Sequence, residues 1–338
     1  MLRPDQRLAI TMQGASNEDI GKMAYGLLRY SKNPIVAVID SRATVRDMAD
    51  YGRVDRRCPI VADLKSAIDL GAEVLVLGIA PPGGRIPADW FAEIDEAVSA
   101  GLCVMNGLHD RLATRYPELR AGQWIWDLRQ EPPGLGTGMG LAAKLTVPRL
   151  LMIGTDMAIG KMTAGLEIMR AGEALGRRVG FVATGQIGIS ITGRGIPLDA
   201  VRVDYASSAV EREVLDVAEG KDLVIIEGQG SLLHPGSTAT LPLMRGSMPT
   251  DLVLCHRAGQ RFLKRLPDVA IPPLKEFVAL YQELATVCGA FPRPVMRGIA
   301  LNCAHLSADE AARACAELED ETGWPVVDPV RGDAGRLV

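Results

Sequence analysis

The stretch "LLMIGTDMAIGKMTAGLEIMR", residues 150–170, decides the fold of the second half of the chain. An apolar run ends at Gly154, a short loop follows, and Gly160-Lys161 opens a segment with helical spacing. A strand, a glycine-bounded loop and a helix that begins with lysine form a phosphate-binding arrangement, because inward N–H groups and the helix N-terminus favour an anion. The residues that we predict to form this loop are Gly154, Thr155, Asp156, Ala158, Ile159, Gly160, Lys161, Met162 and Thr163.

The loop departs from the strict pattern G-x-x-x-x-G-K-[ST] in two ways. Five residues separate Gly154 from Gly160, and Met162 follows the lysine. Thr163 points about 100° away from its neighbour on a helix, so it does not simply replace the metal-binding hydroxyl. Because Mg²⁺ prefers oxygen ligands to a thioether, the sequence favours simple diphosphate binding over rapid ATP hydrolysis, and we assign no metal site. An ordinary glycine-rich turn is the structural alternative.

Composition indicates a soluble globular enzyme. The chain has 338 residues, 48% hydrophobic content and a net charge of −4, which gives no general basic field for nucleic acid or an acidic membrane. No apolar run approaches the roughly 18 residues of a membrane span. The six cysteines form no C-x-x-C pair and are typical of buried reduced thiols. We expect a cytoplasmic protein.

Short β-branched runs alternate with helix-length segments along the whole chain, which predicts two tandem α/β domains with parallel sheets. The boundary is placed at 140/141, giving domains 1–140 and 141–338, within a Gly/Pro-rich segment at 131–149. Predicted strands are 34–40, 72–80, 101–107, 149–155, 178–184, 221–228, 250–256 and 295–302. Predicted helices are 91–100, 161–175, 207–219, 275–288 and 308–322, the last with a capping box of Ser307 and Glu310.

Polar residues follow several strands, where ligands of parallel sheets bind. Glu227 and His234 are the candidate catalytic residues, because a carboxylate or an imidazole can take up a proton. The candidate substrate-binding residues are Gln186, Arg194, Gln229, Ser231 and Arg245, the arginines as carboxylate ligands. His256 is an open case at a strand end, and Asn302 either contacts a purine or lies at the core edge. In the first domain, Asp40, Arg85, Asn106 and His109 follow strands and are candidates for a cleft.

Several motifs together resemble known families. "GTDMAIGKMT" resembles the longer loop of dethiobiotin-synthetase-like P-loop enzymes. With "TGQIGI", "GRGIPLDAV", "EGQGSLLHPG" and "GSMPTDLVLCH", it resembles the two-domain family that includes the DgcN-type D-glutamate N-acetyltransferases. The resemblance spans nearly the whole chain. It implies a Rossmann-like parallel sheet followed by a P-loop NTPase-like parallel sheet, and acetyl transfer from acetyl-CoA to the amine of D-glutamate.

Three functional hypotheses remain open at this point. The leading one is an N-acetyltransferase of D-amino-acid metabolism that uses acetyl-CoA as co-substrate and a small acidic amino acid as acceptor, with Glu227 or His234 as the base. The alternative is an ATP/Mg-dependent ligase or kinase-like enzyme that resembles dethiobiotin synthetase, with Asp156 and Glu227 near Mg²⁺. The third is a regulator that senses a nucleotide or CoA. A homo-oligomer is expected, without a decisive interface signal.

Overall fold

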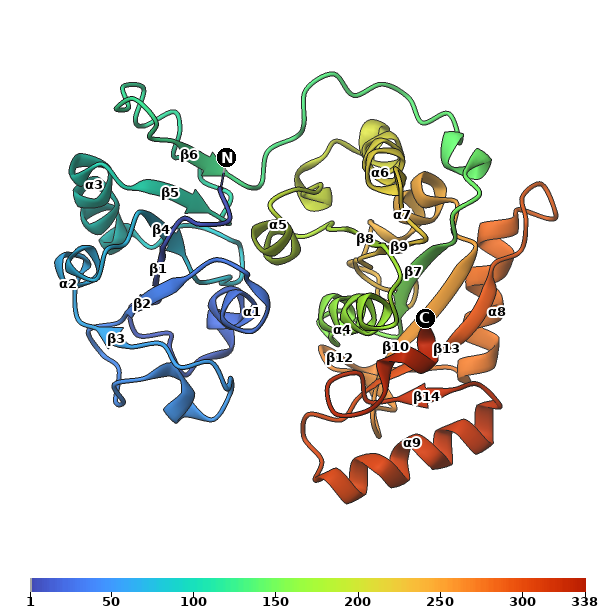
Figure 1. The fold of residues 1–338 in the computed structure, drawn as a ribbon. Helices are drawn as coiled ribbons and strands as arrows, with labels where there is room; N and C mark the ends of the chain where they lie inside the picture. The colour runs from blue at the N-terminus through green and yellow to red at the C-terminus, as the bar shows by residue number, and fades with distance from the viewer. Residues whose placement is uncertain (1) are drawn as a thin grey trace. The chain divides into compact units, whose positions relative to one another are not determined.

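The computed structural model describes residues 2–338, which divide into two compact units. The first unit comprises the residues up to Gln130 together with Gln186–Ala200. The second comprises Glu131–Gly185 and Val201–Val338. Each unit is built around its own sheet with helices on its faces (Figure 1), which confirms the α/β class and its two successive sheets.

The first unit contains a six-stranded sheet in the order β3-β2-β1-β4-β5-β6, and every neighbouring pair is parallel. This is the strand order of doubly wound dinucleotide-binding folds. The strands are β1 (Leu8–Thr11), β2 (Ile35–Ile39), β3 (Ile60–Val61), β4 (Val74–Leu77), β5 (Cys103–Asn106) and β6 (Ile125–Asp127). The helices are α1 (Lys22–Tyr30), α2 (Leu64–Asp69), α3 (Phe91–Ala100) and α5 (Gln186–Thr192).

Helix α5 reaches the first unit from a distant part of the sequence. It packs against α1, and Ile189 and Ser190 are buried there. A Cβ on Gly107 would lie 2.6 Å from the sulfur of Met23 and 3.4 Å from Cγ of Gln186, so α1 and α5 approach the end of β5 closely. The segment 186–200, which the sequence placed in the second domain, therefore packs with the first unit.

The second unit contains a six-stranded parallel sheet in the order β14-β13-β10-β7-β9-β8. Its strands are β7 (Arg149–Gly154), β8 (Val179–Val182), β9 (Leu223–Ile226), β10 (Asp251–Arg257), β13 (Val295–Asn302) and β14 (Val326–Val327). Its helices are α4 (Lys161–Ala174), α6 (Val203–Ala218), α7 (Thr240–Ser247), α8 (Leu274–Thr286) and α9 (Ala308–Thr322). The core consists of β-branched and leucine side chains on the central strands β7, β9 and β10, all of which are buried.

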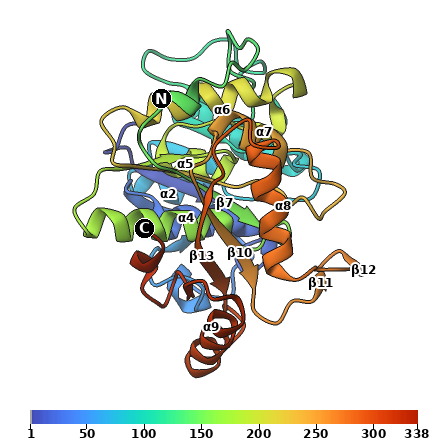
Figure 2. The same ribbon diagram turned by 90° about the vertical axis from the view of Figure 1, so that its right-hand side faces the viewer.

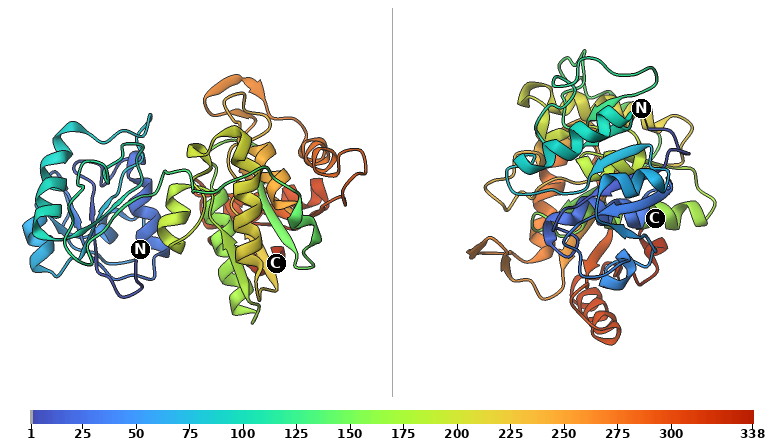
Figure 3. Two further views of the ribbon diagram at one scale, coloured as in Figure 1. Left: turned by 90° about the horizontal axis from the view of Figure 1, so that it is seen from above. Right: turned by 90° about the vertical axis from the view of Figure 1, so that its left-hand side faces the viewer.

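Three smaller features complete the second unit. The antiparallel hairpin of β11 (Phe262–Leu263) and β12 (Leu266–Ala270) projects from its body (Figures 2 and 3). The Gly/Pro-rich segment after residue 131 is fixed to α6, because Glu211 accepts from the N–H groups of Met139 and Leu141 at 3.0 and 2.6 Å. Among the helices of residues 2–338, none has both the length and the apolar character that a bilayer span requires.

Candidate functional site

The loop between β7 and α4 lies at the carboxyl edge of the second sheet. β7 is an inner strand between β10 and β9, and its loop runs from Thr155 to Gly160 before α4 begins at Lys161. Two loop residues have left-handed backbone torsions: Ala158 has φ 54° and Gly160 has φ 105°. At φ 105° a side chain is strained, so the backbone itself requires glycine at 160. These torsions turn the chain inward between the strand and the helix.

The N–H groups in the second half of this loop and at the start of α4 have no acceptor in the described chain. Within residues 2–338, the backbone N–H groups from Ala158 to Thr163 donate to no protein acceptor, and the first hydrogen bond of α4 runs from the N–H of Ala164 to the carbonyl of Gly160. The N–H groups at a helix start have no intrahelical partner and carry its positive dipole end. Six consecutive donors are therefore available to an anion, as the phosphate-loop prediction requires.

The side chain of Lys161 lies buried beneath the loop. Only 6% of it is exposed, and its Nζ donates to the carbonyl of Asp156 at 2.9 Å. Burial lowers the pKa of Lys161, while the nearby acids, among them Asp156 and Glu227, act in the opposite direction. Its aliphatic chain passes over Gly228, where a Cβ would lie 2.8 Å from Cδ of Lys161 and 1.7 Å from the carbonyl oxygen of Met152. The lysine is thus fixed beneath the loop by its bond to Asp156 and by its packing against Gly228.

Side chains of neighbouring strands fix the shape of the loop. Nδ1 of His256 lies 2.9 Å from the hydroxyl of Thr155, and burial lowers the pKa of His256 to about 4. The ring is therefore neutral near pH 7 and supports the loop without placing a charge beside it. Asn302, the last residue of β13, donates from Nδ2 to the carbonyl of Ile159 at 2.9 Å. Its role in this structure is to hold the loop.

Asp156 joins the loop to the β11–β12 hairpin. Its Oδ2 accepts from Nε2 of Gln260 at 2.8 Å and from the N–H of Lys264 at 2.9 Å, and its Oδ1 accepts from the N–H of Met157 at 2.7 Å. With these three donors, the carboxylate of Asp156 holds the backbone of the loop and of the hairpin turn in place. The sequence predicted a place for Asp156 near phosphate or magnesium; in the structure its oxygens are bonded to protein donors. Among residues 2–338, no group of three or more His, Cys, Asp or Glu side chains is arranged to hold a metal ion.

Glu227 lies directly after β9, beside the loop. It is 5% exposed, and its Oε2 accepts from the N–H groups of Thr184 and Gly185 at 2.9 and 3.3 Å. The hydroxyl of Thr184 donates in return to the carbonyl of Glu227 at 2.9 Å. These bonds join the ends of β8 and β9 and fix the direction of the carboxylate toward the edge that carries Lys161.

In the turn after Glu227, one ring nitrogen of His234 contacts the backbone. Nδ1 of His234 accepts from the N–H of Gly236 at 3.1 Å, a contact that leaves Nε2 to carry the ring proton. That Nε2 is buried and has no partner within residues 2–338. With its proton on Nε2, His234 can donate a hydrogen bond, and its role as a base stays a prediction. Ser231 is fully buried, its Oγ accepts from Leu233, and its own N–H donates to Ser237, so it shapes the turn.

The remaining predicted substrate-binding residues differ in their surroundings. Gln186 and the exposed Arg194 belong to the first unit. In the second unit, Gln229 packs against Gly185, where a Cβ would lie 2.5 Å from its Nε2. Arg245 lies on α7 and donates from Nη2 to the carbonyl of Leu284 at 2.9 Å, while its Nη1 is buried without a partner in the described chain. The carboxylate-binding roles of the two arginines stay predictions.

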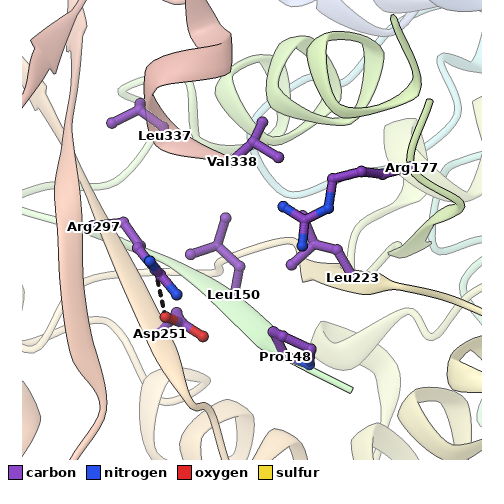
Figure 4. A pocket seen from close by; sticks show the side chains of 8 residues that line it. All are labelled: Pro148, Leu150, Arg177, Leu223, Asp251, Arg297, Leu337 and Val338. Atoms are coloured by element: carbon purple, nitrogen blue, oxygen red, sulfur yellow. Dashed lines mark hydrogen bonds and ion pairs between the residues drawn. The ribbon is translucent and has the colours of Figure 1, made fainter. Parts of the chain in front are cut away.

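A separate cavity of about 180 Å³ lies at the opposite edge of this sheet (Figure 4). Leu150, Leu223 and Asp251, which stand at or near the amino ends of β7, β9 and β10, contribute to its wall. Arg177 and Arg297 flank it, and Arg297 is paired with Asp251 at 2.5 Å. Because the phosphate loop follows the carboxyl end of β7, this cavity is not part of the loop site.

Known proteins share both halves of this arrangement. Residues 43–131 match the "Domain of unknown function (DUF1611_N) Rossmann-like domain", and residues 136–338 match the "Domain of unknown function (DUF1611_C) P-loop domain". The crystal structure of a DUF1611 family protein from Anabaena variabilis ATCC 29413 superposes with a TM-score of 0.94 at 48% identity, covering 98% of each chain.

Two curated relatives carry the name D-glutamate N-acetyltransferase. The protein from Tritonibacter scottomollicae is 36% identical over 81% of this chain and 83% of its own, and that from Pseudoalteromonas sp. is 35% identical over 80% and 82%. Fold, loop and relatives together define an α/β enzyme with a Rossmann-like domain and a P-loop domain. The chain belongs to the DUF1611 family, as the resemblance of its motifs predicted.

Proposed function

We propose that this protein transfers the acetyl group of acetyl-CoA to the amine of D-glutamate. The observation that carries the proposal is a phosphate loop with unpaired N–H groups and a buried lysine, followed by Met162, in a chain whose relatives are named D-glutamate N-acetyltransferase. A diphosphate that is bound but not cleaved needs donors and positive charge. It does not need the hydroxyl that holds Mg²⁺ beside a reacting phosphate.

The proposed reaction needs a proton acceptor and a hydrogen-bond donor near the loop. The neutral amine of the acceptor attacks the thioester carbonyl, a C–N bond forms, the C–S bond breaks, and the sulfur leaves as the CoA thiolate. In this proposal Glu227 accepts the ammonium proton, and Nε2–H of His234 donates to the oxygen that becomes negative in the tetrahedral intermediate. The division of roles follows from the hydrogen bond between Gly236 and Nδ1 of His234, which leaves Nε2 as the donor.

The activity is tested by direct detection of N-acetylated product. Purified protein is incubated with acetyl-CoA and D-glutamate, with L-glutamate and D-aspartate as competing acceptors, and products are separated by mass spectrometry. Thiol reagents are avoided, because Cys288 is an exposed free cysteine that reacts with them. We expect N-acetyl-D-glutamate as the main product. The absence of acetylated product from every acidic amino acid would exclude the proposal.

A lysine variant connects the activity to the loop. Lys161→Met keeps the aliphatic packing against Gly228 and removes the charge. We expect at least about a 100-fold loss of affinity for CoA, measured by calorimetry, because a buried charge–phosphate contact is lost. The melting temperature should not fall, since burial disfavours the charged lysine in the unliganded protein. Mg-ATP is included as a competing ligand; tight binding with ADP release would instead support the ligase or kinase hypothesis.

We also propose that the protein is a cytoplasmic homo-oligomer. Four of its cysteines, Cys58, Cys103, Cys255 and Cys303, are buried free thiols, as expected in a reducing compartment. Val203 and Met139 are large apolar side chains with 82% and 73% exposure, which favours their burial by another chain. Light scattering after gel filtration tests the oligomer, and a mass near 36.2 kDa would contradict it.

A further inference from the structure

The β11–β12 hairpin is fixed directly to the phosphate loop. The carboxylate of Asp156, within the loop, accepts from the side chain of Gln260 and from the backbone of Lys264 at 2.8 and 2.9 Å. The first of these residues lies just before β11 and the second lies in the turn after it. The base and the turn of the hairpin are therefore direct neighbours of the phosphate loop.

The hairpin carries an unbalanced positive charge. Residues 260–270, which we call the basic hairpin, include Arg261, Lys264 and Arg265 and only one acid, Asp268. The three cationic residues are exposed, and within residues 2–338 none of their side chains forms an ion pair with a carboxylate. Like charges on one short arm repel one another, although solvent screens exposed side chains. An anion bound to the arm relieves that repulsion.

One polar atom at the base of the hairpin also has no partner. Oε1 of Gln260 is buried and accepts no hydrogen bond within residues 2–338, although Nε2 of the same amide donates to Asp156 and to the carbonyl of Phe262. A buried amide oxygen without a donor is costly, so a group that donates to it binds favourably. The base of the hairpin thus offers one acceptor and Arg261, and its turn offers Lys264 and Arg265.

We infer that the basic hairpin binds the 3′-phosphoadenosine part of coenzyme A, and that Arg261, Lys264 and Arg265 recognise its 3′-phosphate. This inference rests on the proposed function, in which the loop binds the diphosphate of the same molecule. Coenzyme A differs from ATP and the common dinucleotides in this second phosphate group, a dianion attached to the ribose. Gln260 supplies the acceptor for a donor of the nucleoside, and the hairpin cations supply the charge for the phosphate.

The test compares coenzyme A with 3′-dephospho-coenzyme A, which retains the diphosphate and the pantetheine arm. Calorimetry measures the affinity of each for the full-length wild type and for the variant Arg261→Ala/Lys264→Ala/Arg265→Ala. The control Lys32→Ala/Lys65→Ala/Arg313→Ala changes the net charge equally at exposed residues outside the hairpin. We expect the wild type and the control to bind coenzyme A about 10-fold to 100-fold more tightly than the dephospho form.

In the hairpin variant the two ligands should bind with the same affinity, close to that of the wild type for the dephospho form. Circular dichroism and the unchanged affinity for the dephospho form show that the variant is folded. Equal affinity of both ligands for the wild type, or an unchanged preference in the hairpin variant, overturns the inference and leaves the acetyltransferase proposal in place. Absence of binding of either ligand by the wild type removes the proposed function, and the inference with it.

Discussion

The two units contain loops in equivalent positions that treat their N–H groups in opposite ways. In each sheet an inner strand, β1 or β7, leads through a glycine-containing loop into a helix. After β1, the carboxylate of Asp40 accepts from the N–H groups of Gly14 and Ser16 at 2.7 and 3.3 Å. After β7, the N–H groups from Ala158 to Thr163 have no protein acceptor within residues 2–338.

The difference lies in what the neighbouring residues contact. Asp40 is 4% exposed, and it also accepts from the hydroxyl of Ser16 and from the N–H of Arg42. The carboxylate of Asp40 thus occupies the N–H groups of the β1 loop. Around the β7 loop, Asn302 binds a carbonyl and His256 binds a hydroxyl, so the loop is held rigid while its donors remain available. Loops in equivalent positions therefore have N–H groups that are paired in one unit and available in the other.

The largest effect is expected from closing the space that holds Lys161. In Gly228→Ala, the new Cβ would lie 1.7 Å from the carbonyl oxygen of Met152, a backbone atom that no rotamer change can move. We expect a loss of unfolding free energy above about 4 kcal/mol, measured by urea denaturation. Gly136→Ala is the matched control, because its new Cβ would meet no atom of residues 2–338 within 4 Å. Equal stability of the two variants would show that the space around Lys161 is not restricted.

A second change removes the negative charge of Asp40 beside the β1 loop. Asp40→Asn replaces a carboxylate that accepts from Gly14, Ser16 and Arg42. We expect a loss of about 3 kcal/mol of unfolding free energy, since hydrogen bonds to buried charged groups contribute more than neutral ones. The affinity for coenzyme A should remain within about 3-fold of the wild type. A large loss of affinity in a stably folded variant would contradict the division of roles between the two loops.

A smaller effect, confined to acid pH, is expected at His256. The folded protein lowers the pKa of His256 from 6.5 to about 4, so the unfolded chain binds the proton first as the pH falls. The stability of the wild type should therefore be unaffected by this group above pH 6.5 and decline between pH 6.5 and 4. His256→Asn keeps a polar group near Thr155 and removes the titration. At pH 5 the variant should lose about 2 kcal/mol less than the wild type, relative to pH 7.5.

The His256 comparison is measured by thermal and urea denaturation at several pH values. The difference between the two proteins isolates the single histidine from the other groups that titrate in the same range. Parallel stability curves for the wild type and His256→Asn from pH 7.5 to 4 would show that the ring is not held neutral.

Local patterns predicted much of the fold. Helix α9 runs from Ala308 to Thr322 with the predicted capping box, α3 and β13 have the predicted bounds, and α4 ends one residue early. These elements have clear period or capping signals. No strand was predicted at β1 (Leu8–Thr11), although it is central to the first sheet. The position of α5 in the first unit depends on contacts with α1 that no local signal contains.

The sequence predicted the loop of the candidate site better than the contacts that surround the loop. "GTDMAIGK" specifies the strand, turn and helix start by itself. The roles of Asp156, His234 and Asp40 depend on which donors reach them, namely Lys264, Gly236 and Gly14, and these distances are set by the tertiary fold. Strand-end positions left His256 open and gave Asn302 either a purine contact or a place at the core edge; in the structure both side chains contact the loop.

Hydrogen–deuterium exchange, read by mass spectrometry on peptides covering 155–165 and 12–18, tests most directly how the two loops use their N–H groups. Without ligand, the amides from Ala158 to Thr163 should exchange rapidly, and saturating coenzyme A should slow them by about 10-fold or more; the amides of Gly14 and Ser16 should be slow in both states. Amides at 158–163 that are already protected without ligand, or that remain fast when coenzyme A is bound, would contradict this account.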